Sequence, residues 1–298
     1  MSMVTLQAVG KRYGNFVALQ PTDLEIGDGE FLTLLGPSGC GKTTTLRIIA
    51  GFVEPSEGVV RFDGDDVTRL PQIAGRFPAE ISGGQAQRVA FARAIASPPR
   101  VLLMDEPLGA LDLKLREAMQ VELRRLQREL AITTIYVTHD QGEAMNLSDR
   151  IAVMDRGRVA QFGSAQEIYN RPRTRFVADF IGKINFLHGA AMGRDGEWSV
   201  VQIGDARLRA PAACDGDVTI GVRPEHVGFA NGAAIPEGDN VISGVVTTQV
   251  FNGNLMHVQV AIPGGEWVVE TRPGEHSVAD GQTVRLHWNP AQSVALTE

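Results

Sequence analysis

Gly36-Pro-Ser-Gly-Cys-Gly-Lys-Thr43 decides the fold, because it joins a continuous apolar strand, Phe31–Leu35, to a helix expected over residues 42–50. The glycines allow backbone N–H groups to converge on phosphate oxygens, and the following helix points its positive end at them. Lys42 is expected to reach the β- and γ-phosphates of a nucleotide, and the Thr43 hydroxyl to bind Mg²⁺. The predicted phosphate-binding loop comprises Gly36, Pro37, Ser38, Gly39, Cys40, Gly41, Lys42, Thr43 and Thr44.

A second acidic element follows in the run Val101-Leu-Leu-Met-Asp-Glu106, where an apolar strand ends in two carboxylates. Open parallel sheets bind ligands at the carboxyl ends of their strands, so these acids are expected beside the loop. We expect Asp105 to hold Mg²⁺, directly or through water, and Glu106 to be the general base that polarises an attacking water. A strand that ends in Asp-Glu is weak evidence alone, and becomes strong in a chain that also carries the loop.

The first 160 residues alternate between apolar strands and helical stretches, which is typical of a mostly parallel α/β sheet. Helices are predicted over residues 42–50, 83–96 and 111–130, and strands over residues 31–35, 101–104, 133–138 and 151–154. After residue 186, short strands are separated by turns rich in Gly, Pro, Asn and Asp, at residues 218–222, 241–250, 255–260, 267–270 and 283–288. We therefore predict an α/β domain followed by a small all-β domain, expected to be a barrel.

The composition is that of a soluble globular chain of two domains, with 298 residues, 43% hydrophobic and 21% charged. The longest apolar runs are far shorter than a membrane helix needs, and the N-terminus shows no pattern of a signal peptide. The two cysteines, Cys40 and Cys214, cannot form a disulfide framework and fit a reducing compartment. We expect a cytosolic chain.

The charge is unevenly distributed along the chain. Residues 186–298 carry the whole net charge of −7, with 13 acidic and 6 basic residues. Residues 1–185 have no net charge, with 22 acidic and 22 basic residues. This change supports a domain boundary near residue 185, which gives domains 1–185 and 186–298. Neither part has the basic excess of a nucleic-acid-binding protein, so no nucleic-acid partner is expected.

Ile81-Ser-Gly-Gly-Gln85 opens the helix expected over residues 83–96. With this run, the chain resembles the ATPase subunits of ABC transporters, which are P-loop NTPases with a Leu-Ser-Gly-Gly-Gln signature, here with Ile81 in place of the leucine. The resemblance implies ATP and Mg²⁺ as cofactors. In that family the signature of one protomer closes on the γ-phosphate held by the other, which implies a homodimer whose nucleotide contacts include Ser82, Gly83, Gly84 and Gln85.

Further motifs follow in the order that the family has. Leu108-Gly-Ala-Leu-Asp112 resembles the D-loop at the dimer interface, so Asp112 joins the nucleotide-binding residues. Thr138-His-Asp140 resembles the switch region, which makes His139 a candidate for the residue that contacts the γ-phosphate and the catalytic acid. Tyr13 stands where the family has an aromatic ring that stacks on adenine. The catalytic residues implied are Lys42, Glu106 and His139.

The later part of the chain is similar to importer ATPases that carry a C-terminal regulatory TOBE domain, which is OB-like. The similarity lies in Phe176-Val-Ala-Asp-Phe-Ile-Gly182, Gly221-Val-Arg-Pro-Glu225 and Gly281-Gln-Thr-Val-Arg-Leu286. Polyamine, ferric-iron and sugar importers share this arrangement, and residues 176–187 look most like polyamine importers. The resemblance implies integral membrane permease subunits as partners, an extracytoplasmic solute-binding protein indirectly, and a peripheral position on the cytoplasmic face of the membrane.

The resemblance has a gap. Lys42 and Ser82 are 40 positions apart, and the family's interval is about twice as long. The join falls near Pro71 and Gln72, where the family has a strand that ends in a Mg²⁺-contacting glutamine (the Q-loop) and most of a helical subdomain. No residue here matches that glutamine; Gln72 and Gln85 stand in other contexts. Either the deletion is genuine or the sequence omits a segment. A genuine deletion would expose the edge of a sheet, and this physical cost favours an omitted segment.

Three functions remain open at this stage. The first is an ATP-hydrolysing importer subunit, and the second is a nucleotide-binding remnant that no longer couples to transport. The third is a ligand-sensing regulator that acts through its C-terminal barrel. Intact Lys42, Glu106 and His139 argue against pure sensing, because a sensor does not need a catalytic base.

Overall fold

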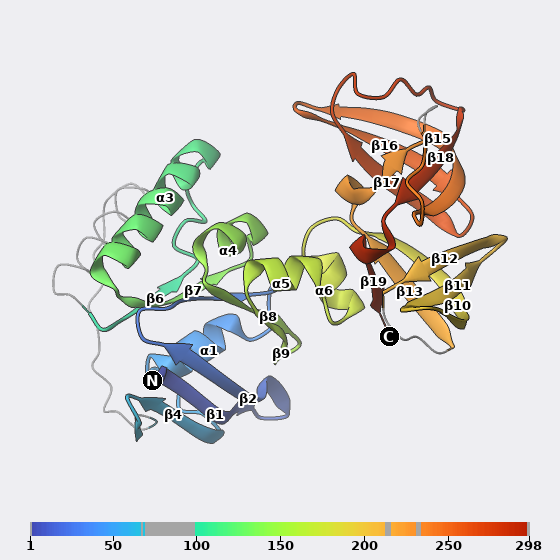
Figure 1. Cartoon of the computed structure of the whole chain (residues 1–298). Helices are drawn as coiled ribbons and strands as arrows, with labels where there is room; N and C mark the ends of the chain where they lie inside the picture. The colour runs from blue at the N-terminus through green and yellow to red at the C-terminus, as the bar shows by residue number, and fades with distance from the viewer. Residues whose placement is uncertain (1, 67, 69–98, 212–215, 231–233, 297–298) are drawn as a thin grey trace. The chain divides into compact units, whose positions relative to one another are not determined.

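The computed structural model describes residues 2–66, 68, 99–211, 216–230 and 234–296, and the chain divides into two compact units, Met1–Ile168 and Tyr169–Glu298 (Figure 1). The division comes before the change in composition near residue 185. The segment between the two positions is tied to the second unit by Arg223, whose guanidinium donates to the carbonyl oxygens of Tyr169, Ala178 and Lys183. The predicted boundary at 185/186 stays a prediction.

The first unit is built on a five-stranded sheet in the order β6-β7-β3-β8-β9. Its first four strands are parallel and β9 runs antiparallel to β8. The bounds are Val101–Asp105 (β6), Thr133–Thr138 (β7), Phe31–Leu35 (β3), Arg150–Asp155 (β8) and Arg158–Gly163 (β9). Every residue of β3 and β7 is buried, which explains why these strands are continuous apolar and β-branched runs. The predicted mostly parallel sheet is confirmed.

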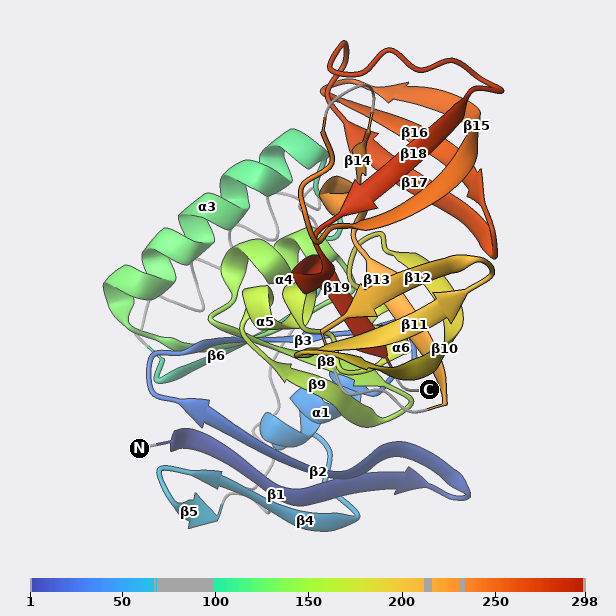
Figure 2. The ribbon, with the colours of Figure 1, turned by 45° about the vertical axis from the view of Figure 1, so that its right-hand side comes forward.

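Alternate side chains of this sheet enter two different cores. Leu34 and Val137 belong to a cluster that includes residues of α1 (Lys42–Ile49), whereas Phe31 and Tyr136 pack in a second cluster with α3 (Leu113–Leu130). Figure 2 shows α1 on one face of the sheet and α3 and α4 (Gln141–Leu147) on the other. The sheet is thus covered on both faces, as parallel sheets are.

A second, antiparallel sheet in the order β2-β1-β4-β5 lies beyond α1 (Figure 2). Its strands are Ser2–Tyr13 (β1), Phe16–Gly27 (β2), Glu57–Phe62 (β4) and Asp65–Asp66 (β5). Leu6, Leu19 and Val60 from this sheet share the core cluster that contains Leu46 and Ile48 of α1. The phosphate-binding loop is therefore anchored between two sheets.

The second unit is rich in strands, as predicted. It contains the sheets β12-β11-β10-β13-β19 and β14-β18-β15-β16-β17, both antiparallel. The bounds are Asn185–Asp195 (β10), Trp198–Ile203 (β11), Ala206–Ala210 (β12), Asp217–Val222 (β13), Gly228–Phe229 (β14), Asn240–Asn252 (β15), Leu255–Ile262 (β16), Gly265–Thr271 (β17), Thr283–Trp288 (β18) and Ser293–Leu296 (β19).

The predicted small all-β domain is confirmed, and its described strands pair into two five-stranded sheets. One contiguous cluster of buried side chains draws on both sheets, including Leu187 and Ile220 from the first and Trp267 and Trp288 from the second. The two indole rings lie 5.1 Å apart between centroids. Sharing one core buries the apolar faces of both sheets.

The short helices complete the described structure. They are α5 (Ala165–Asn170), α6 (Arg175–Phe180) and the 3₁₀ turns η1 (Pro224–His226) and η2 (Pro290–Gln292). The predicted helix over residues 83–96 lies outside the described residues. No helix in the described ranges is long and apolar enough to cross a membrane.

Candidate nucleotide site

The predicted catalytic elements meet at one edge of the five-stranded sheet. β3 runs into the loop that begins at Gly36, β6 ends at Asp105, and β7 ends at Thr138, one residue before His139. Because β3, β7 and β6 are adjacent and parallel, their carboxyl ends lie side by side. The topology therefore brings together groups that are far apart in the chain.

The loop needs its glycines for steric reasons. A Cβ at Gly36 would lie 2.4 Å from the carbonyl oxygen of Met154, and one at Gly41 would lie 2.7 Å from that of Ala18. Gly39 and Gly41 also have φ of 79° and 106°, in the left-handed region. Gly41 directly precedes α1 and has no side chain to cap it, so the first N–H groups of the helix remain for a ligand.

Lys42 lies folded over this loop. Its side chain is 6% exposed, and Nζ donates to the carbonyl oxygens of Gly36 at 2.7 Å and Pro37 at 3.0 Å. Both acceptors are neutral, so these bonds solvate the ammonium without neutralising its charge. The loop thus presents a positive charge inside a ring of backbone groups, an arrangement suited to an anion.

Cys40 is buried in the same loop, with Sγ 3.9 Å from Nζ of Lys42. Burial raises the pKa of the Cys40 thiol, and the Lys42 charge offsets only part of this effect. The thiol therefore stays protonated near neutral pH, as expected for a small residue that fits the loop.

The two predicted magnesium ligands lie next to each other. The Thr43 hydroxyl donates to Oδ1 of Asp105 across 3.2 Å. A hydroxyl and a carboxylate are hard oxygen donors, and Mg²⁺ is commonly held by one or two such groups together with water and substrate phosphates. This pair fits Mg²⁺ in that manner. Clusters of three or more His, Cys, Asp or Glu side chains that could hold a metal by themselves are absent from the described residues.

Glu106 and His139 form a second pair beside the first. Nδ1 of His139 lies 3.2 Å from Oε1 of Glu106, and both side chains are exposed. Glu106 has φ of 46°, a conformation that costs energy for a residue with a side chain. The N–H of Glu106 donates to the carbonyl oxygen of Val137 at 2.9 Å, which holds this turn against β7. The strain is of the kind that accumulates at functional sites.

A buried carboxylate that sequence reasoning missed supports the His139 turn. Glu143 is 2% exposed and accepts from the hydroxyls of Tyr136 at 2.7 Å and Thr138 at 2.8 Å. Burial raises the pKa of the Tyr136 phenol, and Glu143 raises it further. The phenol therefore remains a donor. In the sequence, Asp140 could have drawn attention to Glu143, because an Asp three residues before a Glu is typical of the start of a helix. In the structure, the Asp140 side chain caps α4 by accepting from the N–H of Glu143 at 2.9 Å.

Arg116 joins this support to the segment that resembles the D-loop. It donates from Nη2 to the carbonyl oxygen of Leu111 at 3.0 Å, and its Nη1 lies 3.5 Å from Oδ2 of Asp140. Asp112 itself caps α3 by accepting from the N–H of Leu115 at 3.0 Å. A contact between Asp112 and nucleotide stays a prediction.

For the remaining predicted site residues, the described part of the chain shows no contact with Thr43, Asp105, Glu106 or His139. Tyr13 lies at the end of β1 and is 51% exposed, and Nζ of Lys11 is 5.0 Å from its ring centroid. An exposed ring is available for stacking, and its role stays a prediction. Ser82, Gly83, Gly84 and Gln85 lie outside the described residues.

Two family patterns match this chain. The family described as ABC transporter matches residues 19–77 and 69–109, and the TOBE domain matches residues 220–296. The first match is split into two segments that overlap at residues 69–77, and the predicted join near 71/72 falls within this overlap.

Similar proteins share most of the chain. The spermidine/putrescine import ATP-binding protein PotA of Rubrobacter xylanophilus is 40% identical, over 98% of this chain and 93% of the relative. PotA of Thermobifida fusca is also 40% identical, with the same coverage. The Rubrobacter alignment spans 356 positions, so at least 58 of them have no residue in this chain of 298.

Solved structures share the fold of about three fifths of this chain. A nucleotide-free ATP-binding cassette from an ABC transporter has a TM-score of 0.54 at 21% identity, over 61% of this chain and 100% of the other. A bacterial Atm1-family ABC exporter with ATP bound has a TM-score of 0.51 at 26% identity, over 59% of this chain and 41% of the other.

Proposed function

The chain belongs to the ABC transporter family, and on that premise we propose that it is the ATP-hydrolysing subunit of an importer for a polyamine. The proposal rests on one observation: two pairs of side chains lie together at one edge of the five-stranded sheet. Thr43 bonds to Asp105, and His139 lies against Glu106, beside a loop that holds a buried lysine. These are the groups that phosphoryl transfer to water requires.

The loop supplies binding and charge stabilisation. The N–H groups at the start of α1 and the ammonium of Lys42 would hold the β- and γ-phosphates of ATP. Lys42 would exchange the carbonyl oxygens of Gly36 and Pro37 for phosphate oxygens, so little reorganisation is needed when ATP binds. When bound, Mg²⁺ would neutralise phosphate charge, with Thr43 and Asp105 as its protein ligands.

Glu106 would act as the base. Its exposed carboxylate can accept a proton from a water, and the bond of its N–H to Val137 fixes the turn that aims it. His139 approaches Glu106 through Nδ1, so its other nitrogen, Nε2, remains for the γ-phosphate. Tyr13 would stack on the adenine ring from the exposed end of β1.

The partners follow from the signature and from the relatives. Ser82, Gly83, Gly84 and Gln85 match a motif that completes the site of another protomer, which supports a homodimer. The names of the relatives, import ATP-binding proteins, support permease subunits in a membrane as partners and a peripheral position for this chain on the cytoplasmic face. Spermidine and putrescine in the names of those relatives support a polyamine as the solute.

The replacement Glu106→Gln tests the proposal. It preserves shape and removes the base, so turnover should fall by at least about 100-fold while ATP still binds and holds a dimer together. ATP hydrolysis and size-exclusion chromatography with ATP measure both effects. Glu117→Gln, an exposed residue of α3, is the matched control and should leave both unchanged. Unchanged turnover in Glu106→Gln would refute the role of Glu106.

A regulator that only senses ligands through the second unit is the competing function. It predicts that Glu106→Gln has no effect on any measured property, because sensing needs no base. The strained turn at Glu106 and its contact with His139 favour catalysis.

A further inference from the structure

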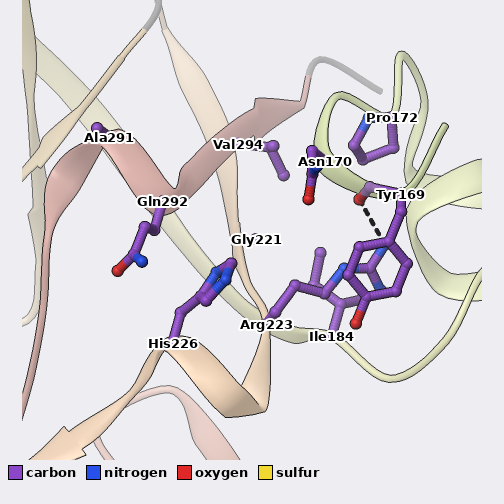
Figure 3. Close-up of a pocket in the computed structure, with 10 residues that line it drawn as sticks. All are labelled: Tyr169, Asn170, Pro172, Ile184, Gly221, Arg223, His226, Ala291, Gln292 and Val294. Atoms are coloured by element: carbon purple, nitrogen blue, oxygen red, sulfur yellow. Dashed lines mark hydrogen bonds between the residues drawn. The ribbon is translucent and has the colours of Figure 1, made fainter. Parts of the chain in front are cut away.

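The second unit contains a cavity of about 250 Å³ that the ATPase function does not use. It lies between the end of α5, the turn η1 and strand β19, and its walls include Tyr169, Asn170, Arg223, His226, Gln292 and Val294 (Figure 3). Gly221 makes this close packing possible, since a Cβ there would lie 2.7 Å from Cδ1 of Ile184 and 3.0 Å from Cγ2 of Val294. The cavity therefore has two amides, two basic side chains and an apolar wall.

Arg223 is a buried cation in this wall. Its side chain is 4% exposed, and its guanidinium carbon lies 4.1 Å from the ring centroid of Tyr169. Its two terminal nitrogens donate only to backbone carbonyl oxygens, those of Tyr169, Ala178 and Lys183. Glu225, the nearby carboxylate, accepts instead from the Tyr169 hydroxyl at 2.5 Å. The guanidinium charge is thus solvated by neutral groups and bonds no carboxylate among the described residues.

Two buried nitrogen atoms of residues that line this cavity are unsatisfied. Nε of Arg223 and Nδ1 of His226 are buried, and neither has a hydrogen-bond partner within the described ranges. In the view of Figure 3 the imidazole of His226 stands between Gln292 and Arg223. A buried polar atom without a partner destabilises the fold, so two such atoms on residues that line one cavity point to a ligand that supplies their partners.

We propose that this cavity binds the oxyanion group of a small molecule, with Nε of Arg223 and Nδ1 of His226 as donors. An anion supplies the missing acceptors and neutralises the guanidinium, whereas a cation such as a polyamine would be repelled. The volume admits a small carboxylate or an inorganic phosphate and is too small for a nucleotide. Ile184 and Val294 would contact an apolar portion of a carboxylate ligand.

Titration of the full chain with sodium acetate, sodium butyrate or sodium phosphate at constant ionic strength tests the site. The readout is the imidazole resonance of His226, assigned by its loss in His226→Ala, together with calorimetric affinity. We expect saturable binding of one oxyanion class, with a dissociation constant on the order of 1 mM, and a shift of that resonance. Response to the two carboxylates identifies a carboxylate ligand, and response to phosphate alone identifies a phosphate. Sodium chloride and ethylammonium chloride should give no saturable change.

Three variants decide whether the designated donors are responsible. His226→Ala and Arg223→Lys should each weaken binding by about tenfold or more, because each removes one charge-assisted or buried donor. If Arg223→Lys does not fold, Gln292→Ala and His226→Ala replace it in the test and should weaken binding. Both should fold, because it is Arg223 that holds the 169–183 segment in place. His188→Ala, an exposed histidine on β10 outside the cavity, should bind normally.

The proposal is overturned if no oxyanion binds saturably, if His226→Ala binds as well as the parent, or if ethylammonium is the only probe that binds. ATP hydrolysis is not part of the readout, so failure here leaves the proposed ATPase function untouched.

Discussion

At the residue scale, burial in the phosphate-binding loop lowers the reactivity of the Cys40 thiol. The thiol is 3% exposed and its pKa is raised by burial, despite the ammonium of Lys42 3.9 Å away. In a Cys214→Ser variant, which leaves Cys40 as the only cysteine, alkylation by iodoacetamide at pH 7 should be at least about tenfold slower than that of free cysteine. The rate should rise with pH above the range in which free cysteine has levelled off, because the thiolate is the reactive form.

The same variant unfolded in urea is the control, since exposure should restore the ordinary rate. Mass spectrometry of the modified protein measures both. Rapid alkylation of folded protein at pH 7 would contradict a protonated, buried thiol.

Residues that act locally could be predicted from the sequence, and residues that act through tertiary contacts could not. Gly36, Lys42 and Thr43 are predicted by spacing alone to serve one ligand, because they stand in one short loop. Glu143 looks like an ordinary first-turn acid of a helix. Its burial under Tyr136 and Thr138 depends on the packing of α4 against β7, which no local pattern encodes.

At the scale of elements, strong patterns located strands to within a residue or two. Residues 133–138 coincide with β7, and the strand predicted over 101–104 extends by one residue, to Asp105. The helix predicted from residue 111 begins at Leu113, since Asp112 caps it and is not helical. In the second unit, alternating apolar residues predicted a buried face on each strand, whereas the pairing of the strands into two sheets around one core depends on tertiary contacts that the pattern does not specify.

The division between units leads to a prediction about truncation. Arg223 holds the carbonyl oxygens of Tyr169, Ala178 and Lys183, so the 169–183 segment is anchored in the second unit. Chains ending at Ile168 and at Gly182 should both bind a fluorescent ATP analogue within about threefold of the full chain, because the described site residues precede both ends. The chain ending at Gly182 should be the more readily proteolysed of the two, since its tail has lost Arg223.

Fluorescence titration and limited trypsin digestion provide the readouts. Loss of ATP binding in both truncated chains, with their helical content intact, would mean that the two units share a core. The proposed boundary at 185/186 would then fail as well.

At the scale of the whole molecule, the predicted gap near residues 71 and 72 bears on coupling to transport. At least 58 aligned positions of the Rubrobacter relative have no residue here, and the family match is split around residues 69–77. The segment carries the Q-loop glutamine and most of the helical subdomain in the family that the sequence resembles. If 298 residues are the complete product, the chain should bind Mg-ATP and hydrolyse it slowly, and it should fail to drive transport.

Binding should survive because Lys42, Thr43 and Asp105 are present and in contact with their expected neighbours. Hydrolysis should fall by about 100-fold relative to a complete relative, which is the usual effect of losing one contact that positions Mg²⁺ and water. Transport should fail entirely, because a rate defect only slows an importer, whereas a lost docking surface disconnects the ATPase from the permease. Reconstitution with the membrane partners, with ATP hydrolysis and polyamine uptake measured in parallel, separates these two effects. Uptake by a chain whose intact mass corresponds to 298 residues would contradict the prediction, and uptake only by a longer gene product would show that the protein contains the segment.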